Sequence, residues 1–189
     1  PNINFVTRLR NPRIAALATT FDDATHILTI YRDGKHVAHG ALNTKLGRQL
    51  IEQFLAGYLR KELKGAPRIL HAENHSFSDI AAKSVHFVNL ATVRELEETV
   101  GRSLDPLRFR ANVYFDGAPA WEERKWLGRV LKVGSARLRV FEEAECCDGA
   151  NVNPETGERD AAILPALQRT YNHPYFGFYG EVIEDGKVH

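Results

Sequence analysis

The stretch that decides the fold is Arg-Val-Leu-Lys-Val-Gly-Ser-Ala-Arg-Leu-Arg-Val-Phe, residues 129–141. Apolar and polar side chains alternate on both sides of Gly134-Ser135, and this alternation is typical of a half-buried strand. We therefore predict that residues 129–133 and 137–141 form two strands that pair as a hairpin across these two residues.

The chain then runs Glu-Cys-Cys-Asp-Gly-Ala-Asn-Val-Asn-Pro-Glu-Thr-Gly-Glu-Arg-Asp over residues 145–160, a segment that holds both cysteines. Its Asn-Pro and Thr-Gly pairs break regular structure, so Cys146 and Cys147 are expected where a strand passes into a loop. Scaffolds often present reactive groups from such positions. Two interpretations stay open here: a buried small hydrophobe beside an inert exposed thiol, or a functional pair whose thiolate binds a soft metal.

The rest of the chain contains many short strands and fewer helices. Asp33-Gly34 predicts a tight hairpin, because a type I′ turn needs positive φ at both central residues. The helices do not alternate one for one with the strands, so we expect a mainly β fold with peripheral helices around a mostly antiparallel, barrel-like sheet. The remaining strands are expected over 14–19, 27–31, 35–38, 68–71, 84–90, 107–115 and 176–183, and the helices over 46–63, 91–100, 120–127 and 160–171.

Composition narrows the functional classes. The 189 residues are 43% hydrophobic, which suffices for one sizeable domain or a domain with a subdomain. The net charge of +1 is spread along the chain, so we expect neither nucleic acid nor a membrane as a partner. Two adjacent cysteines cannot link distant segments, which indicates a reducing, cytoplasmic compartment. They also cannot supply the four thiolates of an ordinary iron–sulfur cluster, so none is expected in this chain.

Two further groups of polar residues are candidate binding sites. In an extended strand over 107–115, Arg108, Arg110 and Asn112 would project from one face. That face is either a solvated surface or a row of donors that grips an anion, for which the guanidinium fork is well suited. His71 and His75 lie in a polar stretch that favours a loop over a metal site.

Four blocks of sequence stand in one order along the chain: Leu107–Tyr114, Val133–Val140, Cys147 with Asn151–Asp160, and Phe176–Tyr179. Together they resemble the MOSC domain, which is named for the C-terminal part of eukaryotic molybdenum-cofactor sulfurases. The resemblance covers residues 76–189, while residues 1–75 look like the rear part of the β-rich N-terminal segment of bacterial members. The chain begins without Met, and both its ends, including the C-terminal end of the domain, look cut.

The resemblance implies a β-barrel domain in which Cys147 is the catalytic residue and the ligand of molybdenum. It also implies that Arg108 or Arg110, together with Asn112, holds the anionic pterin of the molybdenum cofactor. Asn151 occupies the family's polar position four residues after the cysteine. The chain departs from the family where Cys146 replaces an Arg and where Ala111 replaces a Pro.

Three functions follow from this resemblance. The first is an oxidoreductase that binds the molybdenum cofactor, reduces N-hydroxylated compounds and receives electrons from a flavin or ferredoxin-type partner. The second is a sulfur carrier in which Cys147 accepts persulfide sulfur from a cysteine desulfurase and Cys146 resolves it. The third is a catalytically inactive binding domain. For the first two we expect Arg108, Arg110, Asn112 and Cys147 to line one cavity, with the two cysteines pointing in different directions.

Overall fold

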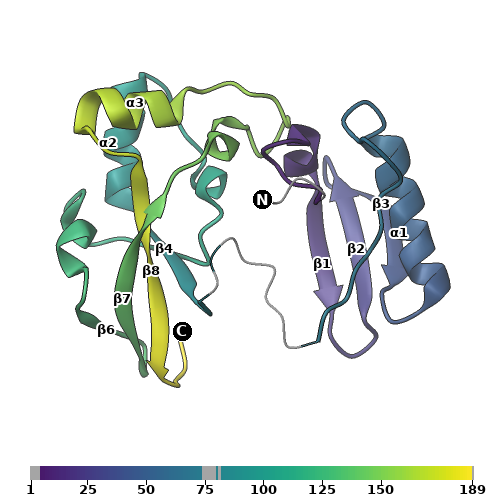
Figure 1. Cartoon of the computed structure of the whole chain (residues 1–189), viewed down its shortest axis with the longest axis horizontal. Coiled ribbons are helices and arrows are strands. Elements are labelled where there is room, and N and C mark those ends of the chain that lie inside the picture. Colours follow the sequence, from purple (N-terminus) through teal and green to yellow (C-terminus); the bar gives the residue numbers. More distant parts are fainter. Residues whose placement is uncertain (1–4, 74–79, 81, 189) are drawn as a thin grey trace. The chain divides into compact units, whose positions relative to one another are not determined.

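A computed structural model describes residues 5–73, 80 and 82–188 of the chain (Figure 1). The chain divides into two compact units: Pro1–Glu73 with Val152–Asp160, and Asn74–Asn151 with Ala161–His189. The long loop after the cysteines thus belongs to the first unit from residue 152 onward, whereas both thiols belong to the second. The domain boundary expected between residues 75 and 76 stays a prediction.

The first unit is a three-stranded antiparallel sheet in the order β1-β2-β3, with helix α1 beside β3 (Figure 1). The turn between β2 and β3 has φ values of 50° at Asp33 and 69° at Gly34, which confirms the predicted hairpin. Its elements are the 3-10 segment η1 (Pro12–Ala16), strands β1 (Ala18–Asp22), β2 (Ile27–Arg32) and β3 (Lys35–Ala41), and helix α1 (Lys45–Tyr58).

Two glycines let helix α1 touch strand β3. The helix begins where the Thr44 side chain accepts a hydrogen bond of 3.0 Å from the Gly47 amide. A Cβ on Gly47 would overlap the backbone oxygen of Ala41, and a Cβ on Gly40 would overlap that of Gly47. The close approach therefore requires glycine on both elements. Gly57, near the other end of the same helix, has open space around its Cα.

We predict that Gly47→Ala destabilises the protein by about 2 kcal/mol or more, because the added methyl group must push the helix off the strand. The matched variant Gly57→Ala should gain up to about 1 kcal/mol from the higher helix propensity of alanine. Urea denaturation of the two variants checks this. Equal stabilities for both would show that the contact between helix and strand is not tight.

The second unit is a five-stranded sheet in the order β5-β4-β8-β7-β6, curled like half of a barrel. Only β4 and β5 pair in parallel, so the prediction of a mainly β, mostly antiparallel fold with peripheral helices is confirmed. Helices α2 and α3 lie side by side beyond one end of the long strands β7 and β8 (Figure 1). The elements are β4 (Val85–Asn89), α2 (Leu90–Val100), η2 (Pro106–Phe109), β5 (Val113–Phe115), η3 (Glu122–Trp126), β6 (Val130–Val133), β7 (Ala136–Glu145), η4 (Asp148–Asn151), α3 (Ile163–Tyr171) and β8 (Tyr175–Glu184).

A glycine in strand β8 divides the core of this unit into two clusters. Gly177 has φ 83°, and a Cβ there would overlap the backbone oxygen of Phe87. Phe176, before the glycine, packs in a cluster with Cys146 and the helices. Phe178, after it, packs on Phe87 in a second cluster against the sheet. Side chains two residues apart in a strand normally share one face. The positive φ of Gly177 lets Phe176 and Phe178 pack in different clusters.

The predicted strand over 107–115 is wrong over most of its length. Residues Pro106–Phe109 form the 3-10 segment η2, and only Val113–Phe115 pair as a strand. Asp105 caps the segment, because its side chain accepts a hydrogen bond of 2.8 Å from the Leu107 amide, and Pro106 suits a helical first position. The expected strands over 14–19 and 68–71 are also not formed as predicted: η1 and β1 occupy the first region, and the second has no regular structure.

Candidate functional site

The two cysteines lie immediately after strand β7 and differ in exposure. Cys146 is 7% exposed and packs in the core cluster that contains Phe176. Cys147 is exposed, and both thiols are free. The Cys146 amide donates a hydrogen bond of 2.8 Å to the Pro174 carbonyl, which continues the pairing of β7 with β8 by one residue. The prediction that the adjacent side chains point in different directions is confirmed.

The loop after Cys147 is held by Asn151, four residues further on. The Cys147 carbonyl accepts a hydrogen bond of 3.0 Å from the Ala150 amide, which starts the 3-10 turn η4. The Asn151 Oδ1 accepts a bond of 2.8 Å from the Ile163 amide, the first residue of helix α3. Because Ala162 offers no side-chain cap, Asn151 satisfies an N–H that the helix leaves open. Asn151 thus anchors the thiol loop to α3, and its binding of a cofactor stays a prediction.

Arg108 lies beneath this loop. Its side chain is only 2% exposed, and its Nη1 donates to the Asn151 carbonyl at 3.4 Å. A buried guanidinium is costly unless it is hydrogen-bonded or paired, so Arg108 is a built-in cation next to the turn that follows Cys147. The sequence argument for Arg108 rested on a strand face that does not exist. The expectation that Arg108, Arg110, Asn112 and Cys147 line one cavity stays a prediction. The shared strand face on which it was based is not formed, because residues 106–109 are a 3-10 segment.

Arg110 and Asn112 follow Arg108 at the surface. Arg110 is exposed and has left-handed backbone geometry with φ 53°, a conformation that costs a non-glycine residue roughly 1 kcal/mol or more. The Asn112 amide donates to the His86 carbonyl at 2.9 Å, and its Oδ1 accepts from the His86 amide at 2.8 Å. These bonds tie Asn112 to strand β4 and leave its Nδ2 donor for another acceptor.

One ring stack joins this segment to strand β8. Phe109 stacks on Phe176 with ring centroids 3.9 Å apart and an angle of 19° between the planes. Cys146 belongs to the same buried cluster. Phe109 therefore couples the segment that carries Arg108 and Arg110 to the core beneath the cysteines.

His86 is a neighbour of Asn112 that no local sequence pattern singles out. Its ring packs against Tyr179 at a centroid distance of 5.1 Å, and its Nε2 lies 3.4 Å from the Phe176 carbonyl. Burial lowers the pKa of His86, and the contact with the Phe176 carbonyl offsets only part of this effect. Only the pairing of β4 with β8 across the sheet reveals this position.

The described residues contain no group of three or more His, Cys, Asp or Glu side chains that could hold a metal ion. His75 lies outside the described residues. Within the described part of the chain, no helix is long and apolar enough to cross a membrane.

The second unit is thus a β domain with a curled, mostly antiparallel sheet and a loop that carries one exposed thiol, and the buried Arg108 donates a hydrogen bond to the Asn151 carbonyl in this loop. The model of the MOSC domain family matches residues 67–189, and the chain belongs to this family. Curated relatives include "Molybdenum cofactor sulfurase" of Drosophila pseudoobscura pseudoobscura, 34% identical over 95 residues, and that of Bos taurus, 28% identical over 105 residues. Each alignment covers 49% of this chain and 12% of the relative, so the chain spans a small part of these proteins.

We predict that a thiol-alkylating reagent labels Cys147 rapidly in the folded protein and Cys146 only when the core opens. Peptide mass spectrometry after timed labelling measures both rates. In urea the two thiols should react alike. Rapid labelling of both cysteines under native conditions would contradict the burial of Cys146.

The depressed pKa of His86 predicts acid destabilisation. The unfolded chain takes up a proton at the ordinary value of 6.5, whereas folded His86 resists protonation because it is buried. Above this pH, His86 is neutral in both states and its contribution to stability is fully present. As the pH falls from there to the lower folded pKa, only the unfolded chain takes up the proton, so the free energy of unfolding decreases. Between about pH 7 and 5, the free energy of unfolding of His86→Gln should fall less steeply than that of the wild type. Parallel curves in urea titrations would refute this role.

Proposed function

We propose that this MOSC domain binds the molybdenum cofactor, with Cys147 as the protein ligand of the metal. The observation that supports this most directly is the exposure of the Cys147 thiol at the end of strand β7, while its neighbour Cys146 is buried. Family membership and the sulfurase relatives support a role related to this cofactor. Both thiols are free, which agrees with our proposal of a reducing, cytoplasmic location.

The residues present fit such a group. A thiolate is a soft ligand of the kind that molybdenum bound through sulfur would take from a protein. Arg110 is exposed, strained and positively charged, and the Asn112 Nδ2 beside it can donate a hydrogen bond. Arginine and amide donors suit the phosphate and the polar ring edges of a pterin. Buried Arg108 adds a positive charge behind the thiol loop.

More specifically, we propose that the protein is an oxidoreductase that reduces N-hydroxylated compounds. The cofactor, when bound, would supply the redox chemistry, and the protein would bind it, orient it and limit the access of water. Electrons would come from a flavin or ferredoxin-type partner. The thiol and the donors from Arg110 and Asn112 are the groups of this chain that would hold the cofactor in place.

A sulfur carrier is the second candidate, favoured by the names of the relatives and by the accessible thiol. The Cys147 thiolate would attack the outer sulfur of a desulfurase persulfide, forming a Cys147 persulfide and releasing the desulfurase cysteine as a thiolate. Cys146 fits the resolving role poorly, because its thiol is buried. Oxidoreductase and carrier share the same thiol, so one pair of variants examines both.

We predict that Cys147→Ser in the full-length protein abolishes both bound molybdenum and cyanide-releasable sulfur, because a hydroxyl is a hard and protonated donor at neutral pH. Cys146→Ser, the matched control, should keep whichever signal the wild type shows. Elemental analysis and a cyanolysis assay measure the two signals after expression in a host that makes the cofactor.

The pattern of signals assigns the function. Molybdenum without labile sulfur supports the oxidoreductase, and labile sulfur without molybdenum supports the carrier. If the wild type shows neither signal, the domain is the inactive binding module. If Cys146→Ser loses the signal and Cys147→Ser keeps it, the assignment of the thiol is wrong.

A further inference from the structure

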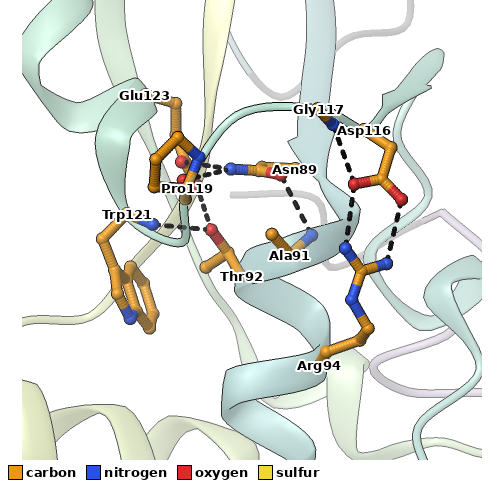
Figure 2. A network of polar contacts seen from close by, with 9 residues as sticks. All are labelled: Asn89, Ala91, Thr92, Arg94, Asp116, Gly117, Pro119, Trp121 and Glu123. Carbon is orange, nitrogen blue, oxygen red and sulfur yellow. Dashed lines mark hydrogen bonds and ion pairs between the residues drawn. The ribbon is translucent and has the colours of Figure 1, made fainter.

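A carboxylate is buried in the second unit, away from the cysteines in sequence. Glu123 is 2% exposed and lies in the 3-10 segment η3. Among the residues that the structure describes, no cation pairs with it. Figure 2 shows that its partners are instead two neutral side chains at the start of helix α2. A buried carboxylate of this kind is costly to maintain, so it calls for an explanation.

The hydrogen bonds of Glu123 are complete and specific. Its Oε1 accepts a bond of 2.7 Å from the Thr92 hydroxyl, and its Oε2 accepts one of 2.9 Å from the Asn89 Nδ2 (Figure 2). Asn89 also donates to the Pro119 carbonyl at 2.9 Å, and its Oδ1 caps α2 through the Ala91 amide at 3.0 Å. One acid thus joins the end of β4, the first turn of α2 and the loop before η3.

The network fixes the conformation of Trp121. The Trp121 amide donates to the Thr92 hydroxyl at 2.9 Å, and its indole Nε1 donates to Glu95 at 2.7 Å. The residue has left-handed backbone geometry, with φ 63°. Such a conformation is strained for a large side chain and persists only where surrounding contacts impose it. The hydroxyl of Thr92, oriented by Glu123, provides one of these contacts.

Trp121 passes this constraint to the core beneath the candidate site. Its ring meets Phe176 edge to face, with centroids 5.9 Å apart and an angle of 90°. Phe176 in turn stacks on Phe109 at 3.9 Å, the residue between Arg108 and Arg110. Cys146 is part of the same cluster. Packed rings therefore connect Trp121 through Phe176 to Phe109, which lies between the two arginines.

We propose that Glu123 is a positioning residue for the cofactor site: by fixing Trp121 it holds the Phe176–Phe109 stack, and with it the segment of Arg108 and Arg110 and the end of β7. This inference rests on the proposed function. Polar networks that are fully satisfied specify one arrangement of a core more strictly than apolar packing does. Loss of the Glu123 carboxylate would therefore let the rings of Trp121, Phe176 and Phe109 shift, and this shift would move the neighbouring arginine side chains.

The full-length protein offers matched variants. In Glu123→Gln, one donor of the network is left without an acceptor whichever way the amide turns, and molybdenum retention during dialysis should fall about tenfold. Asp116→Asn weakens the exposed Arg94–Asp116 pair on the same loop (Figure 2) and should leave retention unchanged.

Leu138→Ala serves as the stability control, because Leu138 packs in the other core cluster of this unit. It should lower the melting temperature at least as much as Glu123→Gln does, yet keep its molybdenum. If both variants lose molybdenum in proportion to their melting temperatures, Glu123 is merely structural and the proposal is overturned. Full retention by Glu123→Gln would overturn it as well.

A second readout does not need the cofactor. In cofactor-free protein well below its melting temperature, Glu123→Gln should raise the alkylation rate of Cys146 about tenfold, because the cluster that covers this thiol loosens. If the wild type retains no molybdenum, the proposed function fails, while these rates still decide the positioning role: unchanged protection of Cys146 in Glu123→Gln would refute it.

Discussion

The candidate site depends on the stack of Phe109 on Phe176, 3.9 Å between ring centroids. Phe109 carries the segment with Arg108 and Arg110, whereas Phe176 belongs to strand β8, beside the end of β7 where the cysteines lie. The Arg108 Nη1 also donates to the Asn151 carbonyl in the thiol loop, at 3.4 Å. Gly177 makes the stack possible, because its positive φ turns Phe176 toward this cluster and Phe178 toward the other.

Around this stack, side-chain direction assigns different roles to two adjacent cysteines. Cys146 continues the inward face of β7 and becomes part of the core, while Cys147 faces outward. The loop that follows is stiffened by Asn151, which caps helix α3 from a distance of twelve residues. An accessible thiol on a rigid loop suits a metal ligand, because ligand geometry is then imposed by the protein rather than acquired on binding.

Local patterns predicted the parts of the fold that local interactions determine. The hairpins at Asp33-Gly34 and Gly134-Ser135, the helix after Thr44 and the opposite directions of the cysteines follow from turn chemistry, capping and strand alternation. The segment over 107–115 failed because alternation of Arg and apolar residues masked the Asp105-Pro106 start of a 3-10 turn.

The positions that the sequence did not reveal depend on distant partners. Asp160 was expected to begin a helix, but Asn151 caps α3 at Ile163 instead. Leu46 and Leu50 fit a helical apolar pattern and yet are 67% and 45% exposed, since the contact of α1 with β3 is made through Gly47. His86 and Glu123 have no signature in their own neighbourhoods, because strand pairing and the contact of η3 with α2 give them their partners.

We propose that the Cys147 thiol is the point at which the protein holds the bound cofactor. Differential alkylation of the full-length protein tests it most directly: Cys147 is labelled in the cofactor-loaded form and in the same preparation after the cofactor has been stripped, and the two rates are compared by peptide mass spectrometry. The account predicts that Cys147 is protected in the loaded form and reacts rapidly in the stripped form, while Cys146 remains slow in both. Equal labelling of Cys147 in a form shown to contain molybdenum would contradict it.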